Sequence, residues 1–332
     1  MTKARIEGMP SHISTYVGAY ATLLLATGVA CAEPFPTRDQ SPLLAGFGIP
    51  MPMPARIGNK GEWSVATDLN WASTAIAETR GAETLICDAE TREMRLTLRH
   101  TVTDRLALQL QVPYRYTGGG TLDSFIDSFH DVTGTPVGAR SDLPTDQIRI
   151  QYARFGTTPL NVTSSSSGLA DIHAGVGWMV AQTSAYALST WLDIKLPTGD
   201  AQKLTGSGAT DVSLTIGGER QLTDRWSTFG QAAMTWLGDG DLALPQRSLL
   251  WSGLAGIEWR AWRTLSLKVQ LDAHSAAFDS DLDFLSEPLI LTAGGDYRLG
   301  SGWRFDFGLS EDIAAEKSPD VVFIFGVRRD LR

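Results

Sequence analysis

The chain has 332 residues, a formal net charge of −9 and a mean hydropathy of −0.06. The acidic balance gives no support to nucleic-acid binding, and no segment after the N-terminal region approaches the roughly 18 continuous apolar residues of a membrane helix. This length suffices for one large all-β domain or for two ordinary domains.

The first 32 residues have the pattern of a secretory signal peptide. Lys3 and Arg5 give a basic start, residues 16–30 form a short apolar core, and Ala30-Cys31-Ala32 fits a small-x-small cleavage site. The core is too short to span a bilayer comfortably. Residues 1–32 are therefore expected to direct export, and the exported chain to be either soluble or a β-barrel.

Two alternatives stay open for this region. Translation from Met9 is an equal alternative, which leaves His12 as the only ionisable side chain before the apolar core. A lipobox ending at Cys31 is a competing interpretation, although Gly28 stands where such boxes usually carry Leu. After cleavage Cys87 is the only cysteine, so an internal disulfide is excluded. The chain also lacks Cys/His metal spacing, and we expect neither a metal nor a cofactor.

Residues 33–58 form a segment without a clear period that is rich in proline and methionine. Because proline removes backbone donors from a β-ladder, the segment is expected to be irregular, with one apolar side. Two interpretations stay open: a periplasmic extension tucked under the domain, or a plug that enters the lumen of a barrel. Its prolines and apolar residues include Pro34, Pro36, Pro42, Leu43, Leu44, Phe47, Ile49, Pro50, Met51, Pro52, Met53 and Pro54.

From residue 59 onward, apolar and polar residues alternate in many short runs. In the clearest run Leu192 and Leu196 share one parity, while Asp193 and Lys195 share the other. Period-two alternation is the mark of a strand with one apolar face.

The runs number about fourteen, or twelve if the candidates at Leu160 and Ser64 are misread. They cover residues 63–71, 94–100, 106–116, 148–152, 160–162, 172–180, 186–196, 212–221, 226–236, 249–259, 265–273, 289–297, 303–309 and 321–327.

Connections between the runs alternate in length, and this decides the architecture. Tight turns such as 103–105 and 222–225 alternate with long connections such as 72–91 and 117–146. Bacterial outer-membrane barrels have short periplasmic turns and long outer loops, whereas a soluble sandwich has no reason to keep that alternation. The sequence therefore predicts an all-β antiparallel transmembrane barrel over residues 59–332, located in the bacterial outer membrane, with a soluble sandwich as the alternative.

Paired tryptophans support the same choice. Trp226 and Trp236 lie ten residues apart on one face. At about 3.3 Å per residue and a tilt of about 40°, they are separated by roughly 25 Å along the membrane normal, the height of an apolar band between aromatic girdles. The expected partners are outer-membrane lipid and lipopolysaccharide, together with the machinery that assembles barrels.

One short amphipathic helix is predicted in the longest outer loop. Leu122, Phe125, Ile126 and Phe129 fall at positions i, i+3, i+4 and i+7. Folded into the mouth of the barrel, this helix would gate the lumen; packed on neighbouring loops, it would be a lid.

The inward-facing parity is polar and carries both charge signs, so interior salt bridges are expected to narrow the lumen. A gated or closed barrel is therefore favoured over an open general porin. The residues expected to line a ligand path or to form its gate are Phe47, Met51, Met53, Phe125, Phe129, Arg99, Arg115, Asp171, His173, Lys268 and Asp272.

Two histidines raise the alternative of a lipid-active enzyme. Asp171 and His173 are two residues apart on an inward face, and Asp272 and His274 repeat that spacing. Nucleophilic catalysis needs a hydroxyl within reach of a base and a third group that orients the base. The chain has no Gly-x-Ser-x-Gly motif, and we expect no enzymatic activity.

Three stretches resemble an uncharacterised family of proteobacterial outer-membrane proteins that is known only as a domain of unknown function. They are Pro-Phe-Pro-Thr-Arg-Asp-Gln-Ser-Pro-Leu-Leu at 34–44, Gly-Phe-Gly-Ile-Pro-Met-Pro at 46–52 and Leu-Asp-Ser-Phe-Ile-Asp-Ser-Phe-His-Asp at 122–131. The resemblance covers nearly the whole mature chain and implies the location and the fold, but little chemistry.

Two looser similarities concern transport. Leu-Pro-Thr-Gly-Asp at 196–200, with Gly-Ser-Gly at 206–208 and Asp211, is similar to a loop of the meta-pathway phenol-degradation outer-membrane proteins, which are thought to pass small aromatic molecules. A more distant similarity runs to the fatty-acid channel family, whose barrels have an N-terminal hatch, although the Asn-Pro-Ala signature of that hatch is absent here.

The expected function is passive or gated uptake of a small compound, hydrophobic compounds included. Residues 33–58 and the helix at 122–129 would control access to the lumen. A lipid-active outer-membrane enzyme and a closed structural barrel remain the alternatives.

Overall fold

The computed structural model describes residues 32–122, 143–300, 302–313 and 316–331. Within them the chain forms fifteen strands, all paired antiparallel, and two short 3-10 helices, η2 (Ala201–Lys203) and η3 (Asp283–Leu285). The strands are β1 (Trp63–Arg80), β2 (Glu83–Thr103), β3 (Leu106–Gly118), β4 (Arg149–Arg154), β5 (Thr157–Val162), β6 (Ser166–Leu169), β7 (Ile172–Gln182), β8 (Tyr186–Leu196), β9 (Asp211–Gln221), β10 (Trp226–Trp236), β11 (Leu249–Arg260), β12 (Leu265–His274), β13 (Leu289–Arg298), β14 (Trp303–Asp312) and β15 (Val321–Leu331). In this part of the chain no helix is long and apolar enough to cross a lipid bilayer.

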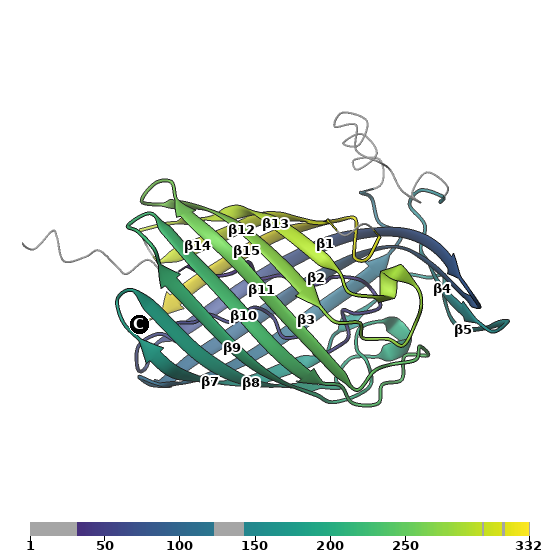
Figure 1. Cartoon of the computed structure of the whole chain (residues 1–332), viewed down its shortest axis with the longest axis horizontal. Coiled ribbons are helices and arrows are strands. Elements are labelled where there is room, and N and C mark those ends of the chain that lie inside the picture. Colours follow the sequence, from purple (N-terminus) through teal and green to yellow (C-terminus); the bar gives the residue numbers. More distant parts are fainter. Residues whose placement is uncertain (1–31, 123–142, 301, 314–315, 332) are drawn as a thin grey trace, which may run out of the picture. The chain divides into compact units, whose positions relative to one another are not determined.

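Twelve strands close into one barrel (Figure 1). β1 pairs with β2 on one side and with β15 on the other, so the first and last strands seal the sheet. The remaining order around the wall is β2, β3 and then β7 to β15, each paired with the next. The predicted all-β antiparallel barrel is confirmed.

The other three strands extend the wall rather than complete it. β4 pairs with the first residues of β2, β5 pairs with β4, and β6 pairs with the end of β3. The count of fourteen barrel strands is therefore wrong. The alternative count of twelve is correct, but not for the reason given. The run at Ser64 belongs to barrel strand β1, and the two runs that lie outside the barrel are 148–152 and 160–162. A strand outside a barrel alternates as a wall strand does, so the period alone does not separate them.

The prediction of a long connection at residues 72–91 is also wrong. β1 and β2 continue through it and meet at a turn, with Arg80 opposite Glu83. The period-two signal fades there because both parities are buried, as at Ala75 and Ile76. Strands that are covered on both faces lose the alternation that identifies strands with one buried face.

The wall itself follows the predicted alternation. Outward apolar side chains such as Ile216 and Val269 are exposed, while their inward neighbours Thr215 and Lys268 are buried. Trp226 and Trp259 stack on the outer surface with ring centroids 6.0 Å apart. The barrel thus presents an apolar face to its surroundings and a polar face to its interior.

The N-terminal segment, residues 32–57, lies inside the barrel (Figure 1, purple). A first arm, residues 33–40, runs from the end of the barrel with the short turns toward the end with the long loops. The chain turns over residues 41–47, and a second arm, residues 48–57, runs back. Gly58 to Gly61 are exposed and connect the second arm to β1.

Two apolar clusters pack against this segment. The outer cluster joins the turn to the long loops and the extended β1–β2 hairpin; it consists of Leu43, Leu44, Phe47, Ile49, Ile76, Leu85, Cys87, Ala89, Ile150, Tyr152, Leu204, Leu237, Leu242, Leu244, Leu250, Ala277, Phe278, Leu282, Phe284 and Leu285. The inner cluster joins the second arm to the wall; it consists of Met53, Ala55, Ile57, Ala107, Met179, Ala187 and Trp191. The predicted helix at 122–129 lies outside the described residues, apart from Leu122.

Candidate ligand path and gate

The first arm is fixed near the short-turn end of the barrel by an ion pair. The Glu33 carboxylate lies 2.8 Å from a guanidinium nitrogen of Arg304 and also contacts Arg328. Two residues further along the arm, the backbone N–H of Phe35 donates to Gln270 Oε1 at 2.8 Å. Charged and neutral side chains of β12, β14 and β15 thus hold the start of the segment.

Arg38 holds the two arms together. Its guanidinium donates to the carbonyl oxygens of Ala45 and Phe47, each at 2.9 Å, and to that of Ile49. Beside it, Asp39 Oδ2 lies 3.1 Å from His274 Nε2 on β12. One arginine therefore satisfies three carbonyl groups, two in the turn and one in the second arm, which a β-ladder would otherwise have to satisfy.

The second arm is bound to the opposite side of the wall. The Gly48 N–H donates to Asp211 Oδ2 at 2.7 Å, and Ser213 Oγ donates back to the Gly48 carbonyl at 2.8 Å. The Met53 N–H donates to Gln231 Oε1 at 2.8 Å. Near the short-turn end, Arg56 forms an ion pair with Glu219. The segment therefore crosses the lumen twice, with contacts along both arms.

A buried charge network lies at the long-loop end of the lumen. Lys195 Nζ is 2.9 Å from Asp171 and 3.0 Å from Asp211, and it donates to the Gly46 carbonyl at 3.0 Å. Asp171 also accepts the N–H groups of Gly199 (2.8 Å) and Ser207 (3.1 Å). The loop between β8 and β9 is thereby drawn inward, and the contacts of its Pro-Thr-Gly-Asp motif serve loop structure.

A second network surrounds Glu93 on β2. Its carboxylate accepts from Arg95 and, at 3.1 Å, from Arg115 Nε. Arg115 also donates to the carbonyls of Ala45 and, at 2.9 Å, Leu204. These side chains are each about 1% exposed, so the network replaces water across this part of the lumen.

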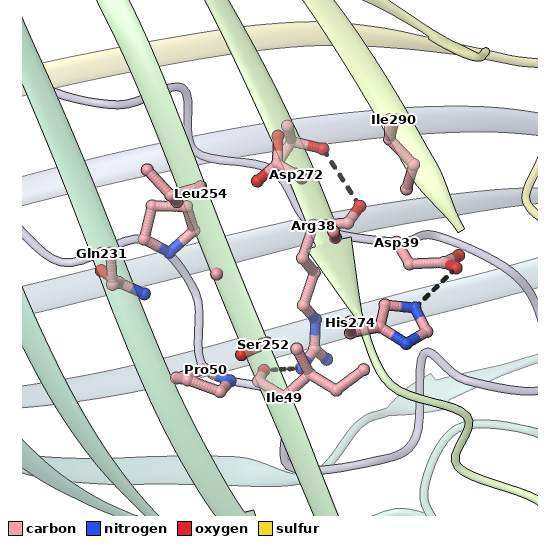
Figure 2. Close-up of a pocket in the computed structure, with 14 residues that line it drawn as sticks. Arg38, Asp39, Ile49, Pro50, Gln231, Ser252, Leu254, Asp272, His274 and Ile290 are labelled. Carbon is pink, nitrogen blue, oxygen red and sulfur yellow. Dashed lines mark hydrogen bonds and ion pairs between the residues drawn. The ribbon is translucent and has the colours of Figure 1, made fainter. Parts of the chain in front are cut away.

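A small cavity remains between the two arms and the wall formed by β10 to β13 (Figure 2). Its volume is about 30 Å³, which holds about one or two water molecules but no organic ligand. Asp272 lines it and accepts from Gln270 Nε2 at 2.9 and 3.0 Å. Other lining residues are Arg38, Asp39, Gln231, Ser252, His274 and Ile290.

The expected path residues are distributed among these features. Met51 and Met53 lie on the second arm, and Phe47 packs edge-on against Phe278 with ring centroids 5.4 Å apart. Lys268 Nζ lies 3.0 Å from Asp306 and 3.6 Å from Asp296.

Four further expected residues lie on the wall or in its networks. Arg99 donates to Gln109 Oε1 at 2.7 Å, Arg115 and Asp171 belong to the charge networks, and His173 pairs with Asp193. Phe125 and Phe129 lie outside the described residues.

Sequence reasoning missed the residues that hold the segment: Glu33, Arg38, Asp39 and Arg56. The available signal was four ionisable side chains within a proline-rich, otherwise apolar segment. In a segment that enters a lumen such charges need buried partners.

The histidines are not arranged for nucleophilic catalysis. His173 Nδ1 lies 2.8 Å from Asp193 Oδ1, and His274 contacts Asp39 and the carbonyl of Ser275. Among the described residues, no hydroxyl group is hydrogen-bonded to either ring. Both imidazoles are therefore parts of the interior hydrogen-bond network.

A family model described as a protein of unknown function (DUF3187) matches residues 19–330. The chain belongs to this family. The expected resemblance to an uncharacterised family is thereby confirmed. No curated protein matches the chain.

Solved structures show the fold. The COG4313 outer membrane channel from Pseudomonas putida F1 superposes with a TM-score of 0.56 and 12% identity, over 83% of this chain and 98% of the channel. The KdgM porin (TM-score 0.45, 7% identity, 81% and 99% covered) and the P. putida toluene transporter TodX (0.35, 12%, 82% and 88%) superpose too loosely to support an argument. The fold is that of an outer-membrane channel.

Proposed function

We propose that this protein is a gated channel of the outer membrane, through which a small compound passes passively when the N-terminal segment moves. In the proposed orientation the short turns face the periplasm and the long loops face outward. The apolar outer surface would then contact outer-membrane lipid and lipopolysaccharide. The channel fold and the occupied lumen support the proposal.

The observation that carries the proposal is how the segment is attached. It crosses the lumen twice, yet it pairs with no strand of the wall, because β1 closes on β15 without it. Its contacts are side-chain hydrogen bonds, ion pairs and apolar packing. The segment can therefore leave the lumen without breaking a backbone ladder of the barrel, which is what a gate requires.

A closed structural barrel is the second candidate. It is favoured by the small size of the cavity, which admits no ligand while the segment is in place. The two candidates differ in whether the segment moves in the folded protein.

Flux from proteoliposomes separates the two functions. The Asp39→Asn, Arg56→Gln double variant weakens one side-chain contact of each arm, Asp39 with His274 and Arg56 with Glu219, so a gated channel is expected to show severalfold faster escape of a small sugar than the unmodified protein. The matched control is Arg80→Gln with Asp283→Asn, which removes a 2.8 Å ion pair on the surface. Equal, background-level flux in all three proteins would favour the structural barrel.

A further inference from the structure

The wall of the lumen binds the N-terminal segment mainly through its backbone. Three N–H groups, those of Phe35, Gly48 and Met53, donate to side chains of β12, β9 and β10 at 2.7 to 2.8 Å. Two of the three acceptors are glutamine side chains, which are neutral. The wall thus offers side-chain acceptors to main-chain donors on both arms.

The carbonyl groups of the segment are bound in the same way. The donors are Asn70 to Pro36, Lys268 to Glu33, Lys195 to Gly46, Arg115 to Ala45, Ser213 to Gly48, Ser189 to Pro54 and Thr101 to Ile57. These donors come from β1, β2, β3, β8, β9 and β12. Backbone groups are common to all polypeptides, so a wall that binds them recognises a polypeptide as such.

Proline fits this mode of binding. Six of the residues from 33 to 58 are prolines, which lack an N–H and favour an extended backbone. An extended chain with few donors needs few acceptors, and the wall mostly supplies donors for carbonyls. Recognition of extended proline-rich peptides elsewhere relies on the same low conformational cost.

Side-chain recognition is concentrated at a few points. In the described chain, charged side chains of the segment contact the wall at Glu33, Asp39 and Arg56. Between these points most contacts are to main-chain atoms or are apolar; two others are Gln109 Nε2, which donates to Met53 Sδ at 3.1 Å, and Lys268 Nζ, which lies 4.5 Å from the centroid of the Phe35 ring. Most positions of the segment can therefore change without loss of a polar contact.

We propose that the lumen wall is a binding site for extended, proline-containing oligopeptides, which the N-terminal segment occupies as an intramolecular ligand. This inference rests on the proposed function, since a free peptide enters only after the segment has moved. The tether raises the effective concentration of the segment to about the millimolar range, so a free peptide competes poorly until the tether is cut.

The exposed connection at residues 58–61 allows that cut in the folded, full-length protein. A protease site inserted between Asn59 and Lys60 is cleaved after the barrel has folded, and the released segment is washed away at low urea. A fluorescent synthetic peptide with the sequence of residues 33–57 is then added, and its binding is followed by anisotropy. Unlabelled competitors are an unrelated proline-rich decapeptide, its all-D enantiomer, and maltohexaose.

The expected result is saturable binding of the labelled peptide and competition by the unrelated L-peptide, with at least tenfold weaker competition by the enantiomer and the sugar. Gln231→Ala and Gln270→Ala should each weaken binding about threefold to tenfold, the loss of one hydrogen bond. Thr292→Ala is the control, because Thr292 faces the lumen but bonds to Ser310 at 2.7 Å.

Competition by the sugar as strong as by the L-peptide would overturn the inference, and so would equal effects of all three substitutions. If the segment stays bound after cleavage, excess labelled peptide is added to the Asp39→Asn, Arg56→Gln variant, in which the segment has lost two side-chain contacts. Failure of the peptide to displace the segment there overturns the inference. Flux through the cleaved protein is recorded in parallel. Peptide binding without flux defeats the channel, and flux without peptide binding defeats only the peptide site.

Discussion

At the scale of single residues, Gln40 is an unfavourable position of the N-terminal segment. Its side chain is 1% exposed, and neither its Nε2 nor its Oε1 has a hydrogen-bond partner among the described residues. A buried polar group without a partner costs about 1–3 kcal/mol. The unpartnered amide of Gln40, at the end of the first arm, therefore lowers the stability of the closed position of the segment.

Gln40→Met removes that cost at nearly the same volume. We expect the thermal unfolding midpoint in detergent to rise and sugar flux from proteoliposomes to fall, both consistent with about 1–3 kcal/mol of added stability in the closed position. Gln202→Met is the control, because Gln202 is exposed on η2. A lower midpoint for Gln40→Met than for the control would show that the Gln40 amide contributes favourably.

Arg38 makes the opposite contribution, because one guanidinium serves three carbonyls. Arg38→Lys keeps the charge but loses the planar fork. We therefore expect the free energy of opening the turn to fall by on the order of 3 kcal/mol. Hydrogen exchange measures this: the amides of Phe47 and Gly48 should exchange about a hundredfold faster. Arg80→Lys, on the surface, should leave them unchanged; unaltered exchange in both variants would contradict the role of Arg38.

At the scale of the elements, the extended β1–β2 hairpin and β4 form a small outer sheet that packs into the outer cluster. Ile150 is fully buried there beside Leu85 and Cys87. The Tyr152 hydroxyl donates to Glu83, which ties β4 to the start of β2. β4 pairs only with residues 83–88 of β2, which β3 does not reach, so loss of packing at β4 should loosen this sheet before the twelve-stranded wall.

Ile150→Ala tests that separation. A buried Ile→Ala change costs about 2–5 kcal/mol. We expect faster proteolysis between residues 148 and 162, while the heat-modified migration of the barrel on a gel stays the same. Thr157→Ala, at an exposed position of β5, is the control. Loss of the folded barrel form in Ile150→Ala would mean that the outer sheet and the barrel unfold together.

The elements also show how far the sequence leads. The wall strands were predictable because a wall with one apolar face imposes period two on each strand, as at Asp193 and Lys195. The outer parts of β1 and β2 were not, since both of their faces are covered. The role of Arg38 was not predictable either, because its partners are carbonyls, which every residue has.

At the scale of the whole molecule, two apolar clusters and a polar zone lie in series along the lumen. The outer cluster covers the turn of the segment, and the inner cluster covers the end of the second arm. Between them lie the buried networks of Glu93 and Lys195 and the cavity beside Asp272. Access from the long-loop end should therefore depend first on the outer cluster, before any ion pair is broken.

Phe47 is the residue of choice for testing that order, because it joins the turn to Phe278 in the outer cluster. In a Cys87→Ala background, Ser252→Cys places a thiol in the lining of the cavity. A membrane-impermeant maleimide added at the long-loop side should react slowly with it. Adding Phe47→Ala removes about 3–5 kcal/mol of packing, so labelling should become at least tenfold faster.

Phe155→Ala is the matched control, since that phenyl group is 75% exposed and lies outside the barrel wall on the same side. Unchanged labelling is expected there. If Phe47→Ala also leaves the rate unchanged while Asp39→Asn raises it, the polar contacts of the segment, rather than the outer cluster, control access to the lumen. Such an outcome would place the gate at the first arm, because Asp39 meets His274 there and not at the turn.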